Sequence, residues 1–314
     1  MHRFAADPLS DIIGLLRPHD CVAAGLDAGG DWAVRFKQHA GMKCNAVVEG
    51  ACTLRVERIA TKSGVASWDP IQLTAGDCFI LPHGRPFLIS ADGMTPGTDA
   101  EAIYAPVPHG GTAVHNEGGA FFMTGARFLV SGSASGALLG VLPPVLVVRD
   151  GARSELVRWV LVRIAAELRA PSPGTALTIS HLSHLLLVEV MRQYLMETAA
   201  EATGWIAALA DPTIARALEA MHANPARRWT VAALASQADM SRTSFAIRFR
   251  RIAGQTPMAY LTTWRMLLAA DRLQRTDDSI ARIAAQVGYS SESAFAHAFR
   301  RELGCSPRRY TSER

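Results

Sequence analysis

Short apolar runs dominate the first half of the chain. Between residues 22 and 148, β-branched and aromatic residues gather in runs of strand length, separated by Gly, Asp and Pro. The clearest of these runs are 32–36, 45–50, 52–57, 71–77, 79–82 and 87–90. Runs at this spacing, with no helix-length periodic segment before Arg153, predict a β-sandwich or a β-barrel. A short amphipathic helix is expected within the first 20 residues.

The apolar period becomes helical after Arg153. Residues 154–169 predict a helix, and residues 175–196 predict a longer one with a broad apolar face. The expected inward stripe of the first helix comprises Leu156, Val160, Ile164 and Leu168. Two helices joined by a tight turn form an αα-hairpin. Because neither helix can bury the apolar face of the other completely, the hairpin must pack on the barrel or on a second subunit. We favour a homodimer contact.

The stretch 229–260 is repeated at 278–310. The aligned pairs include Leu234 with Ile283, Ala235 with Ala284, Phe245 with Phe295, Phe249 with Phe299, Gly254 with Gly304, and Pro257 with Pro307. Each copy predicts a short capped helix, a tight turn, and a longer helix that ends at a glycine before a proline. The expected caps are Thr230 and Ser241 in the first copy, and Asp278 or Ser279 with Ser290 or Ser291 in the second. A short helix, a tight turn and a longer helix make a helix-turn-helix, so the chain contains two.

A continuous helical pattern over residues 260–274 separates the two copies, with Leu261, Trp264 and Leu268 expected inward. This linker helix is long enough to act as a rigid spacer. Two recognition helices must lie about one DNA turn, ~34 Å, apart to enter successive major grooves on one face of the duplex.

The positive charge of the chain lies in the same third as the repeat. The formal net charge is +4, but from Trp205 onward there are 16 Arg, no Lys and 9 acidic residues, a net charge of +7. The guanidinium group suits phosphate geometry, so a basic, all-arginine segment favours a nucleic-acid surface. A solvated helical domain rich in Arg is the alternative.

The first half resembles a cupin. The segment LTAGDCFILPHGRPF (73–87) is similar to the second cupin motif, and KCNAVVEGACTLRVE (43–57) to the first. Metal-binding cupins carry histidines where this chain has Asn45 and Phe87, so neither a metal centre nor another cofactor is expected. A small barrel without metal can still hold one ligand in its mouth. The candidate lining residues are Phe36, Asn45, Val47, Phe79 and Phe87; their alternative role is simply core packing.

The C-terminal third resembles the DNA-binding domain of the AraC/XylS family of bacterial transcription regulators. The paired helix-turn-helices, the linker helix with its WRM sequence and the terminal segment IARIAAQVGYSSESAFAHAFRRELGCSPRRY carry this resemblance. It implies ligand-responsive control of transcription, dimerisation through the N-terminal half and contact of activators with RNA polymerase. The fold class expected is α+β multidomain. Its expected parts are a cupin-like β-barrel sensor (1–150), a helical hairpin (151–200), a linker (201–210) and an all-α double helix-turn-helix domain (211–314).

The outward positions of the two recognition helices are the candidate contacts to double-stranded DNA. They are Arg242, Thr243, Ala246, Ile247, Arg250 and Arg251 in the first copy, and Ser291, Glu292, Ser293, Ala296, His297, Arg300 and Arg301 in the second. Arg242 suits guanine, Thr243 or Ile247 suits a thymine methyl, and Glu292 suits cytosine. The later arginines suit phosphates, which position a protein without specifying sequence.

Two other functions fit parts of the sequence. A cupin enzyme with a DNA-binding tail is one, although Asn45 and Phe87 argue against its metal. A regulator switched by oxidation of a cysteine, with Cys21 as the candidate, is the other. The leading hypothesis remains a non-enzymatic regulator with a small-molecule effector, without a membrane segment. It is expected in the bacterial cytoplasm and on the nucleoid when bound to DNA.

Overall fold

The computed structural model describes eight ranges of the chain: 7–57, 69–93, 95–108, 110–130, 134–140, 142–151, 155–197 and 204–312. The chain forms two compact units. The sheet unit comprises residues 18–130 and 142–197, and the helical unit comprises residues 1–17, 131–141 and 198–314. In this division residues 1–17 and 131–141 group with the C-terminal third, whereas the ranges expected from sequence placed them in the sensor domain. Of the expected linker, residues 201–203 lie outside the described residues and 205–210 form a helix.

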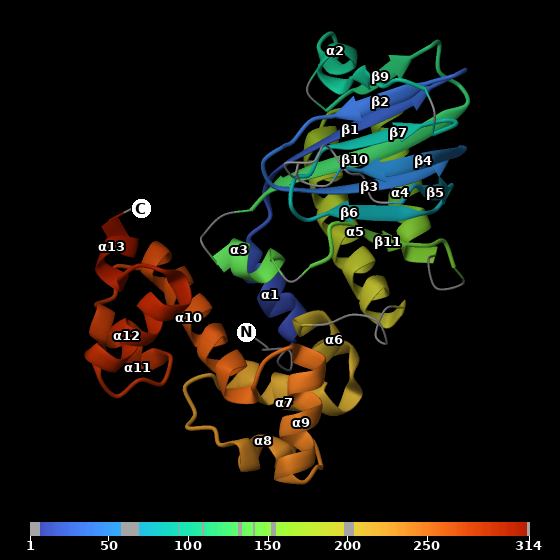
Figure 1. The fold of residues 1–314 in the computed structure, drawn as a ribbon. Helices are drawn as coiled ribbons and strands as arrows, with labels where there is room; N and C mark the ends of the chain where they lie inside the picture. The colour runs from blue at the N-terminus through green and yellow to red at the C-terminus, as the bar shows by residue number, and fades with distance from the viewer. Residues whose placement is uncertain are drawn as a thin grey trace, which may run out of the picture. The chain divides into compact units, whose positions relative to one another are not determined.

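Two sheets build the sheet unit (Figure 1). The six-stranded sheet has the order β11 (Leu146–Val148), β6 (Cys78–Leu81), β3 (Met42–Glu49), β10 (Phe121–Leu129), β1 (His19–Ala28), β9 (Thr112–His115). The five-stranded sheet has the order β5 (Ile71–Thr74), β4 (Ala51–Val56), β7 (Phe87–Ser90), β2 (Ala33–Phe36), β8 (Thr98–Asp99), and the short helix α2 (Ala100–Tyr104) follows β8. The sequence predicted a β-sandwich or a β-barrel, and the cupin resemblance favoured the barrel. The described strands hydrogen-bond as two separate sheets, which is the arrangement of a β-sandwich.

The core of this unit lies between the sheets. Alternate residues of each strand point inward, as the pleat requires. The buried set includes Leu26, Val34, Val47, Leu54, Leu73, Phe79, Phe87, Ile89, Phe121 and Met123. The ring of Phe87 stacks on that of Phe36 with 4.4 Å between centroids and meets Phe79 edge-on.

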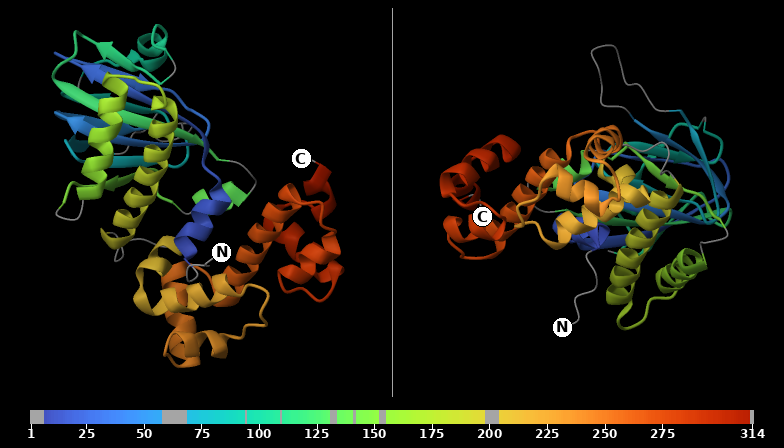
Figure 2. Two further views of the ribbon diagram at one scale, coloured as in Figure 1. Left: turned by 180° about the vertical axis from the view of Figure 1, so that it is seen from behind. Right: turned by 90° about the horizontal axis from the view of Figure 1, so that it is seen from below.

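Helices α4 (Glu155–Arg169) and α5 (Thr175–Glu197) pack against each other and against the six-stranded sheet (Figure 2). Val160, Ile164 and Leu168 of the expected stripe are buried, but Leu156 is exposed. Val157 and Leu161 are buried in addition. Helix α4 is apolar on two sides, and the sequence pattern assigned Leu156 to the wrong one.

The helical unit contains ten helices among its described residues. They are α1 (Pro8–Leu16), α3 (Ala134–Leu139), α6 (Trp205–Ala210), α7 (Pro212–Ala223), α8 (Val231–Gln237), α9 (Arg242–Ala253), α10 (Pro257–Arg275), α11 (Ile280–Gln286), α12 (Glu292–Leu303) and α13 (Pro307–Ser312). Asp7 caps α1 through the N–H groups of Leu9 and Ser10. Helix α1 then packs on α3, α7 and α10, and Arg17 forms an ion pair with Asp271 of α10.

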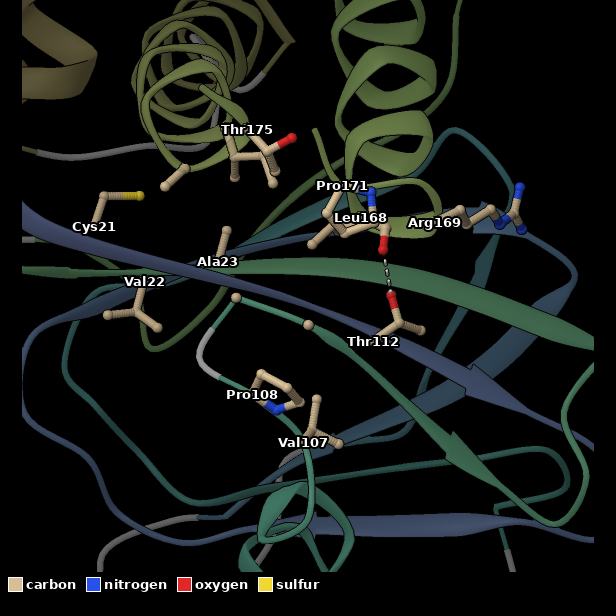
Figure 3. A pocket seen from close by; sticks show the side chains of 14 residues that line it. Cys21, Val22, Ala23, Val107, Pro108, Thr112, Leu168, Arg169, Pro171 and Thr175 are labelled. Atoms are coloured by element: carbon tan, nitrogen blue, oxygen red, sulfur yellow. Dashed lines mark hydrogen bonds between the residues drawn. The ribbon is translucent and has the colours of Figure 1, made fainter. Parts of the chain in front are cut away.

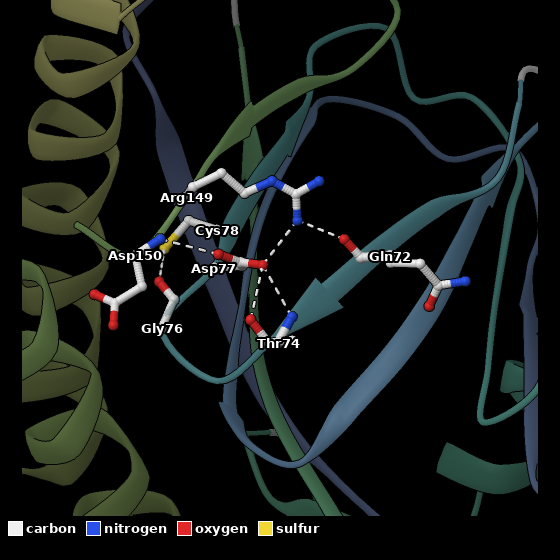
Figure 4. A network of polar contacts seen from close by, with 7 residues as sticks. All are labelled: Gln72, Thr74, Gly76, Asp77, Cys78, Arg149 and Asp150. Atoms are coloured by element: carbon white, nitrogen blue, oxygen red, sulfur yellow. Dashed lines mark hydrogen bonds and ion pairs between the residues drawn. The ribbon is translucent and has the colours of Figure 1, made fainter.

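The carboxylate of Asp77 links two segments of the sheet unit that are distant in sequence (Figure 4). Asp77 lies just before β6 and is almost completely buried. It accepts hydrogen bonds from the N–H of Thr74 at 2.9 Å and the N–H of Asp150 at 2.9 Å, and it pairs with the Arg149 guanidinium at 2.8 Å. One side chain therefore ties the turn after β5 to the segment that follows β11.

Replacement of this carboxylate should destabilise the sheet unit. In Asp77→Asn one accepting oxygen becomes an N–H₂ group that faces donors, and Arg149 loses its partner. We expect the free energy of unfolding to fall by about 2–3 kcal/mol, measured from the shift of the urea midpoint. Asp150→Asn is the matched control, because its partner Arg158 is 55% exposed and such a pair should contribute much less than the buried one. Equal losses in the two variants would contradict the assigned role of Asp77.

Candidate nucleic-acid interface and ligand cavity

The first helix-turn-helix is built from α8 and α9. Thr230 caps α8 through the N–H of Ala233, and Ser241 caps α9 through the N–H of Ser244. The turn between them contains Asp239 in a left-handed conformation, with φ of 51°. Phe245 and Phe249 are fully buried on the inner side of α9. Caps and aromatic stripe agree with the sequence-based expectation.

The second copy, α11 and α12, repeats this construction. Of the alternatives left open by the sequence, Ser279 and Ser291 are the caps, which accept from the N–H groups of Arg282 and Ala294. Phe295 and Phe299 are fully buried. Both longer helices end at a left-handed glycine, as expected for this type of helix end.

One loop and one arginine connect the two copies through α10. Arg265 of α10 donates hydrogen bonds to the carbonyls of Pro225 at 2.7 Å and Arg227 at 2.8 Å, in the loop before α8. Its guanidinium also lies 5.9 Å from the ring centroid of Tyr289, next to the turn of the second copy. Gly288 in that turn has φ of 87°, and a Cβ there would lie 2.6 Å from the carbonyl oxygen of Ala226. The first loop and the second turn are thus in direct contact, a tie that the sequence did not reveal.

A buried histidine joins α1, α7 and α10. His222 lies 2.8 Å from the hydroxyl of Tyr260 through Nε2 and 3.1 Å from the carboxylate of Asp11 through Nδ1. Its ring stacks on Trp264 at 3.8 Å. Burial lowers the pKa of His222 against the opposing effect of Asp11. A neutral ring satisfies all three groups, because Nδ1–H donates to Asp11 while Nε2 accepts from Tyr260.

The predicted DNA-facing residues of α9 lie mostly on its exposed side. Arg242, Thr243, Arg250 and Arg251 are exposed and Ala246 is half-buried. Ile247 has 66% of its surface exposed, which is unusual for a large aliphatic side chain. Arg248, which the sequence did not single out, turns to the opposite side and pairs with Asp211 at 2.7 Å. Asp211 also caps α7, so this pair fixes α9 against α7.

The corresponding set on α12 has the same distribution. Exposed members are Ser291, Glu292, Ser293, His297, Arg300 and Arg301, and Ala296 is half-buried. Arg301 pairs with the neighbouring Glu302 at 3.0 Å. Within the described residues, Arg300 has no ion-pair partner. The exposed face of α12 is therefore polar and acidic at its start, whereas that of α9 is basic and apolar.

A cavity of about 520 Å³ opens between the two sheets near β2, β3 and β10. Phe36 and Asn45 line it, as the sequence predicted. Val47, Phe79 and Phe87 lie in the buried core cluster. Lys43, Tyr104 and Arg127 also line the cavity, and the sequence pattern gave no sign of them.

Cys21 lies at a second cavity, of about 830 Å³, between β1 and the helices α4 and α5 (Figure 3). Burial raises the pKa of its thiol, with a smaller opposing effect from Ser183. Burial also raises the pKa of Cys44 and of Cys52 to about 12. Because the thiolate is the reactive form, a raised pKa lowers the reactive fraction of each thiol at neutral pH.

His39, before the first cupin-like motif, and His83, within the second, are not grouped with other metal-ligating side chains among the described residues. His39 lines the cavity between the sheets, and His83 lies 3.1 Å from the carbonyl of Leu142. Within the described ranges no three His, Cys, Asp or Glu side chains gather as metal ligands. In the same ranges no helix is both long and apolar enough to span a bilayer.

The contact at Gly288 should control the geometry of the interface. In Gly288→Ala the added Cβ meets backbone atoms of Ala226 and the residue keeps a positive φ. We expect a loss of about 2–3 kcal/mol in unfolding free energy, together with weaker DNA binding. The control is Gly254→Ala, which also has positive φ but meets no atom within 4 Å, so it should cost only about 1 kcal/mol. Urea unfolding and DNA titration measure both; equal effects would refute the importance of the Ala226 contact.

Comparison with known proteins agrees with both halves of the chain. A cupin family model matches residues 7–196 and a helix-turn-helix domain model matches residues 234–313. A putative AraC-like transcription regulator of Streptomyces lividans is 40% identical over 97% of each chain. The transcriptional regulator AlkR of Acinetobacter baylyi is 29% identical over 90% of this chain and 92% of its own. The DNA-binding domain of AdpA, solved with its target DNA, is 35% identical over 33% of this chain and 92% of that one, with a TM-score of 0.32. None of these relatives is described as an enzyme, and this chain belongs to the AraC-like transcription regulators, with a cupin N-terminal domain and a helix-turn-helix DNA-binding domain.

Proposed function

We propose that this regulator reads DNA with both helix-turn-helix motifs, and that α9 is the principal reader of bases. The observation that carries this proposal is the exposed face of α9. Ile247 exposes an apolar side chain that packing inside the chain does not explain. Arg242, one turn earlier at the N-terminal end, has no ion-pair partner among the described residues and is free to bond guanine. Together they offer contacts to a guanine edge and to a thymine methyl.

Phosphate contacts follow from the arginines at the ends of these helices. Arg250, Arg251 and Arg300 are exposed on the last turns of α9 and α12. In helix-turn-helix proteins the base-reading residues lie near the start of the recognition helix. Arginines two turns later suit phosphates, which position the protein without reading sequence. Glu292 and His297 give α12 a different reading surface, so the site of one subunit should be non-palindromic.

The sheet unit supplies the signal in this proposal. Its cavity is the size of a small-molecule site and combines an apolar wall with a few polar groups. A small-molecule effector, double-stranded DNA and, at activated promoters, RNA polymerase are the proposed partners.

A homodimer through α4 is the second part of the proposal. Leu156, Trp159 and Val162 form an apolar strip on the outer side of this helix, and Trp159 is 58% exposed. Such a strip at the surface of a folded unit favours a protein contact. A second copy of the same chain is the occupant that we propose, because the resemblance to AraC-type regulators implies dimerisation through the N-terminal half.

Two arginine variants test the reading of DNA. Arg242→Ala should lose about 1–3 kcal/mol on the preferred sequence and much less on unrelated DNA. Arg300→Ala should weaken binding to both DNAs alike and reduce the salt slope by about 1. The preferred sequence would come from selection of random duplexes, and affinities from fluorescence anisotropy at several salt concentrations.

The control for charge is Arg192→Ala, which removes an arginine of the sheet unit that already pairs with Glu189. It should leave both affinities unchanged. If Arg242→Ala lost affinity equally on all sequences, the role of α9 as base reader would be refuted.

A charge on α4 should break the proposed dimer. Trp159→Glu removes a central aromatic side chain and places a carboxylate in the contact, so we expect the dimer dissociation constant to rise at least about 30-fold. Light scattering after size-exclusion chromatography measures the change. Val114→Glu is the matched control, because Val114 is 60% exposed but lies on β9 rather than on α4. Dissociation in both variants, or in neither, would contradict the assignment to α4.

A further inference from the structure

The cavity between the sheets contains two cations side by side. Lys43 on β3 and Arg127 on β10 are direct register partners in the six-stranded sheet, and both line the cavity. Like charges directly opposite each other on a sheet destabilise it. Neither side chain has an ion-pair partner among the described residues. The cavity therefore contains two positive charges that no carboxylate of the described residues neutralises.

The acidic residues at the rim do not neutralise this pair. Asp99 and Glu101 are both bound by Lys37, whose ammonium lies 2.6 Å and 2.8 Å from their carboxylates. Lys43 instead lies over aromatic rings, 4.5 Å from the centroid of Phe36 and 5.1 Å from that of Phe87. These contacts accept a cation but leave its charge without a carboxylate.

Two groups at the cavity, Lys43 and His39, have lowered pKa values. Burial lowers the pKa of Lys43 to about 8, with Arg127 adding to the shift. Burial, followed by the charges of Lys43 and Arg127, lowers the pKa of His39 to about 4. Both shifts have the sign expected where positive charge is crowded and poorly hydrated.

An unsatisfied amide lies beside the cations. Asn45 is two residues along β3 from Lys43, its surface is only 3% exposed, and its Nδ2 group has no hydrogen-bond partner among the described residues. Gly125 lies opposite it on β10, where a Cβ would be 2.5 Å from the Asn45 side-chain oxygen. The glycine leaves room for the amide at the cavity wall. A buried N–H₂ group without an acceptor is costly, so it is usually explained by a missing partner.

We propose that this cavity binds a small carboxylate with an apolar body, its carboxylate held by Lys43, Arg127 and Asn45. The two cations attract the negative charge of a carboxylate, and together with the amide they offer hydrogen-bond donors to its two oxygens. Val22, Ala24 and Met123 line the same cavity and would contact the apolar body. This proposal rests on the proposed sensing role of the sheet unit and names the chemical class of its effector.

The larger cavity beneath α4 and α5 is the weaker candidate for an anion. Among the described residues Arg169 is the one charged member of its lining, and it already pairs with Glu49 at 2.9 Å and lies over the ring of Phe122. The described lining therefore leaves no positive charge unpaired.

The test uses the full chain and matched pairs of probes. Phenylacetate is compared with phenylacetamide, and octanoate with octanamide, by isothermal titration calorimetry. Each pair shares its apolar body and differs in charge. We expect at least one acid to bind at least about tenfold more tightly than its amide. If no acid binds, or if amides bind as well as acids, the proposal is wrong.

Two variants locate the site. Lys43→Met and Arg127→Met should each abolish the preference for acid over amide. Each should also raise the melting temperature of the unliganded protein, because an unpaired, poorly hydrated cation is removed. Arg192→Met is the control, because Arg192 is a cation of the same unit that pairs with Glu189 and does not line the cavity, and it should retain the preference. Retention of the preference in Lys43→Met, or a lowered melting temperature in both Met variants, would overturn the proposal.

DNA binding distinguishes this inference from the function on which it rests. Without probe, the Met variants should bind the selected duplex as the unaltered chain does. Loss of acid binding with normal DNA binding would refute the effector class alone. Acid binding by a chain that shows no sequence preference for DNA would refute the proposed function alone.

Discussion

The relation between the two helix-turn-helix motifs depends on the hydrogen bonds of one arginine. Arg265 leaves the middle of α10 and holds the carbonyls of the loop before α8, while the turn of the second motif presses on the same loop at Gly288. The guanidinium donates in fixed directions, so it holds the loop more firmly than a flexible ammonium could. Both motifs also bury their phenylalanines against helices of this unit. The helix caps make each helix-turn-helix rigid by itself. The contacts of Arg265 and Gly288 hold the two motifs relative to each other.

The polar groups of the sheet unit are arranged in two contrasting ways. Asp77 accepts hydrogen bonds from Thr74, Arg149 and Asp150. In the cavity between the sheets, by contrast, Lys43 and Arg127 have no carboxylate partner and the Asn45 amide has no acceptor among the described residues. The hydrogen bonds of Asp77 hold the segments around it in a fixed arrangement. Unsatisfied groups store unfavourable free energy that a ligand of the right charge would release. The sheet unit therefore contains one site where a buried charge is hydrogen-bonded and another where polar groups lack partners among the described residues.

The sequence predicted best what depends on neighbours along the chain. Caps at Thr230 and Ser241, and buried rings at Phe245 and Phe295, follow from spacings of three or four residues. Strand alternation predicted which residues face inward, but it does not show whether an inward residue lies in the core or at the cavity. For that reason Phe36 lines the cavity while Phe79 and Phe87 fill the core. The cation pair and His222 depend on contacts between distant segments, which periodicity does not encode.

The membership of α1 in the helical unit has a consequence for the order of folding during synthesis. Helix α1 is made first, yet its partners in α7 and α10 are made near the end: Asp11 and His222 are 211 residues apart, and Arg17 and Asp271 are 254 apart. At bacterial rates of translation the gap lasts on the order of tens of seconds. During that time the sheet unit can complete its strands, while α1 can pack only on α3. The first helix of the chain therefore completes its packing late, and a chain cut before α10 would lack one of the three helices on which α1 packs.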